Sequence, residues 1–164
     1  MRIGAAGLAW RMQLYLIRHA QAEAGEDDAA RPLSKRGREQ IRQMGRFLRR
    51  NGALATTEFW HSPLVRARDT AVLLVQQLKI RARLVQVAGL RYSDNPAIMA
   101  KRAGRISRPV ALVGHEPHLS ALASLLVAGT AQPARFELKK CAVVALERVR
   151  GRWFVRWQVS PEII

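Results

Sequence analysis

The amino-acid sequence predicts one α/β domain with three layers, α/β/α, and three observations support this prediction. The chain has 164 residues, which is about the length of one domain. Short apolar runs alternate with longer segments of helical periodicity, as in mostly parallel sheets that carry helices on both faces. Apolar residues make up 49% of the chain and charged residues 24%, which is the balance of a folded globular protein.

The first strand and the first helix are the clearest elements. Residues 14–17 form a continuous apolar run, which is typical of a strand buried on both faces. An acidic loop over residues 21–31 leads to a helix with Ser34 as its N-cap. Apolar residues then recur at helical spacing, and Gly52 marks the end of the helix.

The middle of the chain repeats this alternation. Residues 58–61 predict a second strand, and Ser62-Pro63 opens a second helix in whose first turn Pro63 is tolerated. That helix extends to about Leu78. Residues 84–87 predict a short strand, and residues 96–103 predict a short helix.

The last third of the chain adds another strand and helix, followed by a hairpin. Residues 109–113 are apolar and predict a buried strand, which a helix over residues 118–128 follows. Strands over residues 141–149 and 153–159 flank Arg150-Gly151-Arg152, which indicates a hairpin. This hairpin adds at least one antiparallel strand, and its tryptophans fit packing positions better than base-stacking positions.

The N-terminal segment and the single cysteine indicate how the chain is divided and in which compartment it is expected. Residues 1–11 are predicted to be an N-terminal extension and residues 12–164 a single domain, and both Met1 and Met12 are candidate starts. No stretch approaches the ~18 apolar residues that a membrane span needs. Because Cys141 is the single cysteine, no internal disulfide can form, and a reducing, cytoplasmic location is expected.

The chain is strongly basic. It has 28 Lys and Arg residues against 12 Asp and Glu residues, which gives a formal net charge of +16. Such a charge attracts phosphate groups, acidic proteins or nucleic acid. A solvated arginine-rich surface explains the same composition, so nucleic-acid binding is not expected from the charge alone.

All four histidines lie in segments that follow predicted strands. Arg18 and His19 follow the first strand, His61 ends the second, and His115 and His118 follow the strand over residues 109–113. In open α/β sheets, ligands bind beyond the carboxyl ends of the strands. The sequence therefore predicts one pocket of imidazole and guanidinium groups, with His61 at its rim or in strand packing and His118 as a partly exposed residue opening a helix.

Such a pocket is suited to a phosphoryl group. Arginine offers planar, permanently charged donors that match phosphate oxygens. A neutral imidazole can attack phosphorus and form a phosphohistidine, and a second imidazole can stabilise the charge that develops. Two arginines and two histidines suffice for phosphoryl transfer, so no metal and no other cofactor is expected.

Three motifs resemble the signatures of one enzyme family. Leu16-Ile17-Arg18-His19-Ala20, Ser62-Pro63-Leu64-Val65-Arg66-Ala67-Arg68-Asp69-Thr70 and Gly114-His115 occur in the family's order and spacing. They resemble the histidine phosphatase superfamily, which has the phosphoglycerate-mutase-like fold. The resemblance implies a mixed, mostly parallel six-stranded sheet with one antiparallel strand.

The resemblance also assigns roles to the matched residues. His19 would be the phosphorylated nucleophile, Arg18 and Arg66 would clamp the phosphoryl group, and His115 would be the second histidine that binds it. Ala20 stands where the family has glycine, and a methyl group there is tolerated if the backbone keeps a negative φ.

Within the superfamily, the chain resembles the small SixA-type phosphohistidine phosphatases. Arg31-Pro32-Leu33-Ser34 and the ending Trp157-Gln158-Val159-Ser160-Pro161 are similar to elements of that branch. Larger members insert a helical lid in the stretch that lies here between Leu78 and Pro109, which is short. The expected site is therefore open and suited to a phosphohistidine on a signalling protein, such as a histidine-containing phosphotransfer domain or a phosphocarrier protein.

The proton donor and the metal are the open questions at the site. Ester hydrolysis needs an acid for the leaving alkoxide, and Asp94 and Glu116 are the candidate donors. A phosphohistidine leaves as imidazole, so a missing acid agrees with that substrate. His115, Glu116 and His118 could in principle hold zinc, but their spacing lacks the helical His-Glu-x-x-His order, and no metal site is predicted.

Two other functions fit the same residues. One is a phosphatase that acts on small phosphomonoesters, which high activity on a simple aryl phosphate would favour. The other is a basic binding module that keeps the phosphatase fold without turnover, which an intact pocket without a phospho-enzyme would favour.

Overall fold

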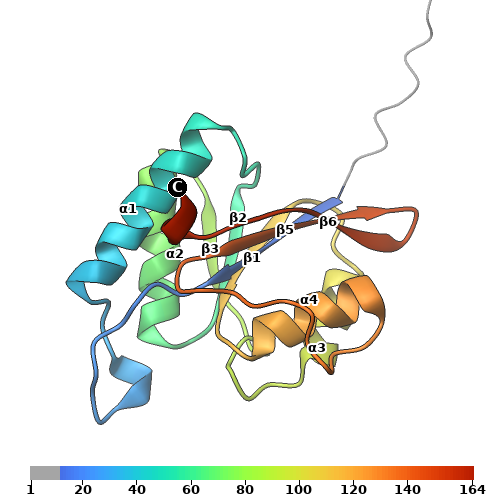
Figure 1. Ribbon diagram of the computed structural model, residues 1–164, viewed down its shortest axis with the longest axis horizontal. Helices are drawn as coiled ribbons and strands as arrows, with labels where there is room; N and C mark the ends of the chain where they lie inside the picture. The colour runs from blue at the N-terminus through green and yellow to red at the C-terminus, as the bar shows by residue number, and fades with distance from the viewer. Residues whose placement is uncertain (1–11) are drawn as a thin grey trace, which may run out of the picture.

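The computed structural model describes residues 12–164, so the predicted N-terminal extension lies outside the described part. One six-stranded sheet has the order β3-β2-β4-β1-β5-β6 and forms the middle layer (Figure 1). The strands are β1 (Met12–Arg18), β2 (Glu58–His61), β3 (Arg83–Gln86), β4 (Val110–Gly114), β5 (Val143–Val149) and β6 (Arg152–Val159). β5 pairs antiparallel with both of its neighbours, and the other pairings are parallel. The predicted mixed sheet with one antiparallel strand is confirmed.

Helices cover both faces of this sheet. The helices α1 (Lys35–Arg50) and α2 (Val65–Leu78) lie on one face, and α3 (Pro96–Ala103) and α4 (His118–Ala128) lie on the other (Figure 1). Side chains of β1 alternate between the two cores, because Tyr15 and Ile17 pack with α1 and α2 whereas Leu14 and Leu16 pack with α3 and α4. Burial on both faces explains why this strand is a continuous apolar run.

The first helix follows its sequence signals closely. The Ser34 side chain accepts a hydrogen bond from the backbone N–H of Gly37 at 3.0 Å, which satisfies one free donor of the first turn. Ile41, Met44 and Leu48 are buried against the sheet, whereas the arginines of the opposite face are largely exposed. The N-cap prediction is confirmed, and the arginine-rich face of α1 is a solvated one.

The second helix starts later than the sequence indicates. Its first residue is Val65 and its N-cap is Leu64, so Pro63 precedes the helix and the expectation that Pro63 lies in its first turn is wrong. The physical reason is that Ser62 still belongs to the sheet edge, since its N–H donates to the Val113 carbonyl at 3.0 Å. The Ser62 hydroxyl then accepts from the Leu64 N–H at 3.2 Å and closes the turn before the helix.

The remaining expectations for the second half hold within one or two residues. The helices at 96–103 and 118–128 and the β5–β6 hairpin are confirmed, with Arg150 and Gly151 at positive φ in the turn. Trp153 is buried, and the Trp157 ring packs 6.1 Å from the Tyr15 ring, as expected for packing residues. Short 3₁₀ helices occur at η1 (Asp28–Ala30), inside a segment predicted as loop, and at η2 (Pro161–Ile163). In residues 12–164, no helix has the length and apolarity needed to cross a bilayer.

Candidate active site

The parallel pairing of β1, β2 and β4 brings their carboxyl ends to one edge of the sheet. Arg18 is in register with Gly114, and His61 is in register with Val113. The residues that follow these strands therefore meet at the same edge, as the strand-end rule predicts.

His19 lies directly after β1 and is 4% exposed. Its backbone is fixed between the end of β4 and the segment before β5, since its N–H donates to the Gly114 carbonyl at 3.0 Å and its carbonyl accepts from the Cys141 N–H at 3.3 Å. Its Nδ1 lies 2.7 Å from the Ala20 carbonyl oxygen. Because a carbonyl oxygen can only accept, Nδ1 carries the proton and Nε2 keeps a free lone pair.

The environment keeps the His19 ring neutral. Burial, and after it the positive charge of Lys140, lower the pKa of His19 to about 2. Burial disfavours the charged imidazolium, and a nearby cation disfavours it further. Nε2 is therefore available as a nucleophile throughout the neutral pH range.

His115 faces His19 from the loop after β4. The two ring centroids lie 4.9 Å apart with an interplanar angle of 51°. Nε2 of His115 lies 2.7 Å from the Ser62 hydroxyl, and Nδ1 is buried without a hydrogen-bond partner. Burial, followed by the charge of Arg66, lowers the pKa of His115 to about 3, so this ring is neutral as well.

Two guanidinium groups flank the histidines. Arg18 Nη1 donates to the Leu138 carbonyl at 2.7 Å, while its buried Nε has no partner. Arg66, in the first turn of α2, is 4% exposed, and its Nη1 donates to the Asp28 carbonyl at 2.6 Å. Both side chains therefore direct a permanent positive charge to the sheet edge where His19 lies.

Thr70 couples the nucleophile segment to α2. The Thr70 hydroxyl accepts from the Ala20 N–H at 3.0 Å and donates to the Arg66 carbonyl at 2.7 Å. A single buried side chain thus fixes the backbone next to His19 relative to the backbone of Arg66. Ala20 itself is fully buried and has no positive φ, so its methyl group is accommodated where the family has glycine.

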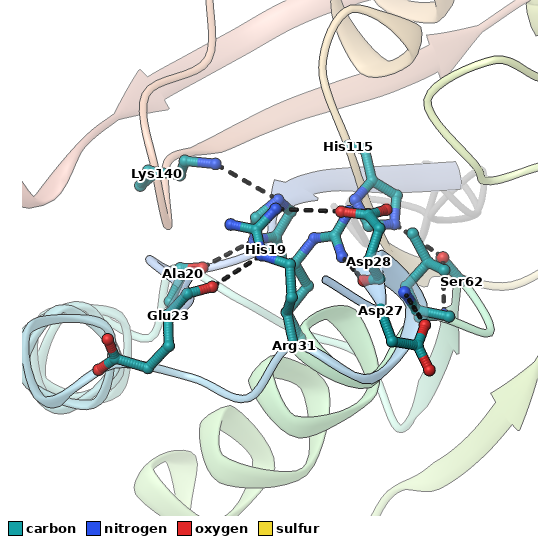
Figure 2. A network of polar contacts seen from close by, with 12 residues as sticks. His19, Ala20, Glu23, Asp27, Asp28, Arg31, Ser62, His115 and Lys140 are labelled. Carbon is teal, nitrogen blue, oxygen red and sulfur yellow. Dashed lines mark hydrogen bonds and ion pairs between the residues drawn. The ribbon is translucent and has the colours of Figure 1, made fainter. Parts of the chain in front are cut away.

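Three more charged residues complete the pocket (Figure 2). Lys140 Nζ lies 3.4 Å from Nε2 of His19. The carboxylate of Asp28 lies between two guanidiniums, 3.0 Å from Arg31 Nη1 and 3.1 Å from Arg66 Nη2. Burial opposes ionisation of Asp28, but its hydrogen bonds to Arg31 and Arg66 outweigh burial and lower its pKa.

The two proposed proton donors are engaged elsewhere. Asp94 Oδ2 accepts from the backbone N–H of Arg91 at 2.8 Å, which closes a turn. The Glu116 carboxylate accepts from the backbone N–H of Ser120 at 3.1 Å and from the Ser120 hydroxyl at the start of α4. Burial raises the pKa of Glu116. Neither carboxylate has a hydrogen bond to His19, His115 or the two arginines.

The other two histidines are both buried. His61 Nδ1 lies 2.9 Å from the Ser62 carbonyl, which fits the strand-packing alternative. His118 is 2% exposed, so the expectation of a partly exposed histidine is wrong. Neither of its buried ring nitrogens has a hydrogen-bond partner in the described residues, and it lines a cavity of about 290 Å³ together with Tyr92 and Asp94.

Metal ligands are not gathered at this edge. Among residues 12–164, no three His, Cys, Asp or Glu side chains are arranged to hold a metal ion. The arrangement instead provides a neutral nucleophilic nitrogen, a second imidazole and several fixed positive charges. This combination is suited to accept a phosphoryl group and to stabilise the charge that builds up during transfer.

A sequence model of the histidine phosphatase superfamily (branch 1) matches residues 14–94. This span includes Arg18, His19 and Arg66, and His115 lies beyond it. The chain therefore belongs to the histidine phosphatase superfamily and is a phosphatase. A search of curated protein sequences finds no significant match.

Solved structures share the whole fold. The protein histidine phosphatase SixA, solved with tungstate, has a TM-score of 0.81 at 21% identity over 92% of this chain and 97% of that chain. A protein assigned as SixA from Agrobacterium tumefaciens has a TM-score of 0.77 at 20% identity, over 92% and 98% of the two chains. A mycobacterial glucosyl-3-phosphoglycerate phosphatase has a TM-score of 0.67 at 18% identity, over 89% and 97%. These likenesses establish the phosphoglycerate-mutase-like fold.

The sequence analysis gave no role in the pocket to five residues, which are Ser62, Thr70, Arg31, Asp28 and Lys140. Ser62 and Thr70 stand inside a matched motif, so the motif already contained the signal for them. Asp28 and Lys140 stand outside every motif, and only the folded chain places them beside Arg66 and His19.

Proposed function

We propose that the chain is a protein phosphohistidine phosphatase that acts through a phosphorylated His19. The observation that carries this proposal is the hydrogen bond from Nδ1 of His19 to the Ala20 carbonyl, which leaves Nε2 unprotonated among positive charges. Nε2 attacks the phosphorus of the substrate, a bond forms between Nε2 and phosphorus, and the bond to the leaving group breaks.

The leaving group explains why no carboxylic acid is needed. A phosphohistidine whose second ring nitrogen carries a proton leaves as neutral imidazole, whereas an ester leaves as an alkoxide that needs a proton donor. Asp94 and Glu116 both hold backbone groups instead. The pocket is therefore better matched to a nitrogen–phosphorus bond than to an alkyl ester.

The same reasoning applies to the second half of the reaction. In phosphorylated His19, Nδ1 keeps its proton, which is hydrogen-bonded to the Ala20 carbonyl. The enzyme imidazole therefore also leaves in its neutral form. A water oxygen bonds to phosphorus, the bond to Nε2 breaks, and the water proton passes to the departing phosphate. His115 and the two arginines stabilise the phosphoryl oxygens in both steps.

The chain between α2 and β4 supports a protein as substrate. This stretch contains only β3 and the eight-residue helix α3, joined by turns. The site thus lies at the sheet edge without an inserted helical lid. SixA, which shares this fold, is a protein histidine phosphatase and was solved with the oxyanion tungstate.

The partner would be a signalling protein such as a histidine-containing phosphotransfer domain or a phosphocarrier protein. A net charge of +16 attracts an acidic partner over a Debye length of about 8 Å at physiological salt. Salt should therefore reduce the rate mainly through the association step. Tight, sequence-specific binding of DNA or RNA at physiological salt would contradict this assignment.

The alternative substrate class is a small phosphomonoester. The cavity of about 290 Å³ lined by Tyr92, Asp94 and His118 favours this alternative, because a small leaving group could occupy it. A mycobacterial phosphatase of the same fold is described as acting on glucosyl-3-phosphoglycerate. The two classes differ in whether a carboxylic acid is required.

Activity of carboxylate variants on both substrate classes distinguishes them. Asp94→Asn and Glu116→Gln should keep most of the activity toward a phosphohistidine protein, while His19→Ala should abolish it. General acid catalysis is worth about 10²–10⁴-fold. A loss of about a hundredfold or more in Asp94→Asn on phosphohistidine would show that an acid does act, and the phosphomonoester alternative would then be preferred. An intact pocket that forms no phospho-enzyme would indicate a binding module.

A further inference from the structure

Lys140 is a charged residue of the pocket that no motif includes. It lies in the segment that leads into β5, two residues after Leu138, whose carbonyl accepts from Arg18. Figure 2 shows its ammonium directed at the His19 ring, and Nζ lies 3.4 Å from Nε2. Among residues 12–164 no carboxylate forms an ion pair with it, whereas the neighbouring Lys139 is exposed and pairs with Glu137 at 2.8 Å.

The position of Nζ defines which atoms it would contact during the reaction. Phosphorus bonds to Nε2, so an ammonium group this close to Nε2 lies beside the non-bridging oxygens of the transferred group. The leaving group departs on the side opposite Nε2, because attacking and leaving atoms are roughly in line. Lys140 is therefore placed to bind phosphoryl oxygens and is poorly placed to protonate the leaving group.

We propose that Lys140 is a further catalytic residue, whose ammonium binds a non-bridging oxygen of the phosphoryl group as that group moves to and from Nε2 of His19. The proposal rests on the phosphoryl transfer to His19 and is independent of the identity of the substrate. In the resting protein the ammonium donates toward the Nε2 lone pair, and on substrate binding it transfers this hydrogen bond to the phosphoryl oxygen.

The charges around Lys140 agree with this role. Arg18, Arg31, Arg66 and the neutral His19 face it, and burial followed by these three guanidinium charges lowers the pKa of Lys140 to about 8. Such a cluster of positive charges is unfavourable by itself and is relieved by a doubly charged anion. Above a pH of about 8 the free protein loses the ammonium, so kcat/KM should fall as the pH rises through this value.

Three variants test the proposal. Lys140→Met removes the charge and keeps the length, Lys140→Arg restores a charge that does not titrate, and Lys139→Met is the matched control at the exposed neighbour. Losing one such donor typically lowers kcat by about 10²–10³-fold. We expect Lys140→Met to transfer the phosphoryl group to His19 about a hundredfold more slowly, and Lys139→Met to stay within about twofold of the parent.

The pH profile and phosphate binding give readouts that a merely structural role would not change. The fall of kcat/KM near a pH of about 8 should vanish in both variants, with low activity throughout in Lys140→Met and with activity retained above pH 8 in Lys140→Arg. The affinity for inorganic phosphate, measured by calorimetry, should decrease about tenfold in Lys140→Met, as expected for one lost charge-assisted hydrogen bond of about 1.5 kcal/mol.

Separate outcomes identify which claim is wrong. If the parent forms no phospho-His19, the proposed function fails, and phosphate affinity still decides the role of Lys140. If Lys140→Met transfers the phosphoryl group to His19 as fast as the parent does, and its kcat/KM shows the same fall near pH 8, the role of Lys140 is refuted. Should Lys140→Met not fold, an unshifted pH profile in Lys140→Arg refutes it equally.

Discussion

Lowering the pH from 7 to 5 should destabilise the folded chain through the buried rings of His19 and His115. The pKa of His19 is lowered to about 2 and that of His115 to about 3, from an ordinary value of 6.5. At pH 5 the unfolded chain therefore protonates both rings, while the folded chain keeps them neutral. Because the unfolded state binds more protons, the free energy of unfolding falls as the pH drops below 6.5.

The magnitude follows from the distance between pH 5 and the unfolded pKa. Each pKa unit corresponds to about 1.36 kcal/mol, so about 1.5 units give about 2 kcal/mol for each histidine. This value holds for any folded-state pKa below about 4. The two rings together contribute about 4 kcal/mol, a large part of the ~5–15 kcal/mol by which domains are stable.

Urea unfolding at pH 7 and pH 5 measures this contribution. The parent and the variants His19→Gln and His115→Gln are compared, and the titration of all other groups cancels in the difference. Each variant should lose about 2 kcal/mol less stability on acidification than the parent does, whatever its stability at pH 7. Lys139→Met serves as a control that should keep the parental pH dependence. An equal pH dependence in His19→Gln and the parent would refute the claim that His19 is held neutral.

Three further predictions concern the ion pair between Asp28 and Arg66, the close packing of α1 at Gly37, and the dependence of activity on metal ions. Asp28→Asn removes the charge that holds the Arg66 guanidinium, so kcat/KM should fall about tenfold in steady-state assays; parental activity would show that Arg66 needs no such partner. Gly37→Ala would place a methyl group 2.0 Å from the Gln21 carbonyl oxygen, so it should lower the free energy of unfolding by about 1–3 kcal/mol in denaturant titrations; unchanged stability would contradict this close packing. Exhaustive treatment with EDTA should leave the activity intact, and a loss that zinc restores would instead indicate a metal at His115 and His118.

The fold and the four central residues could be predicted because their signals are local. The run over residues 14–17 is apolar throughout because both faces of β1 are covered. Arg18, His19 and His115 follow strands that pair in parallel, so the rule for strand ends is sufficient to bring them together. Arg66 lies in the first turn of α2, shortly after the end of β2, and follows the same rule.

The residues that were missed depend on contacts between distant segments. Lys140 lies 121 positions from His19 in the sequence, and Asp28 lies 38 positions from Arg66. Neither contact leaves a periodic pattern or a short motif. His118 was expected to be partly exposed because it opens a helix, but it is 2% exposed in the folded chain, where it lines a cavity with Tyr92. A helix start predicts a cap and cannot indicate what packs against it.

Identifying the ring nitrogen of His19 that carries the phosphoryl group would test the proposed phospho-enzyme. The enzyme is labelled with ¹⁵N-histidine, whereas the phosphohistidine protein that serves as substrate carries no ¹⁵N. The phospho-enzyme is trapped during turnover, and nitrogen–phosphorus coupling is measured by nuclear magnetic resonance. Because Nδ1 is protonated and donates a hydrogen bond to the Ala20 carbonyl, we predict phosphorylation at Nε2 of His19. The His19→Ala variant should show no nitrogen–phosphorus coupling. Phosphorylation at Nδ1, at another residue, or turnover without any phosphohistidine on the enzyme would contradict the account.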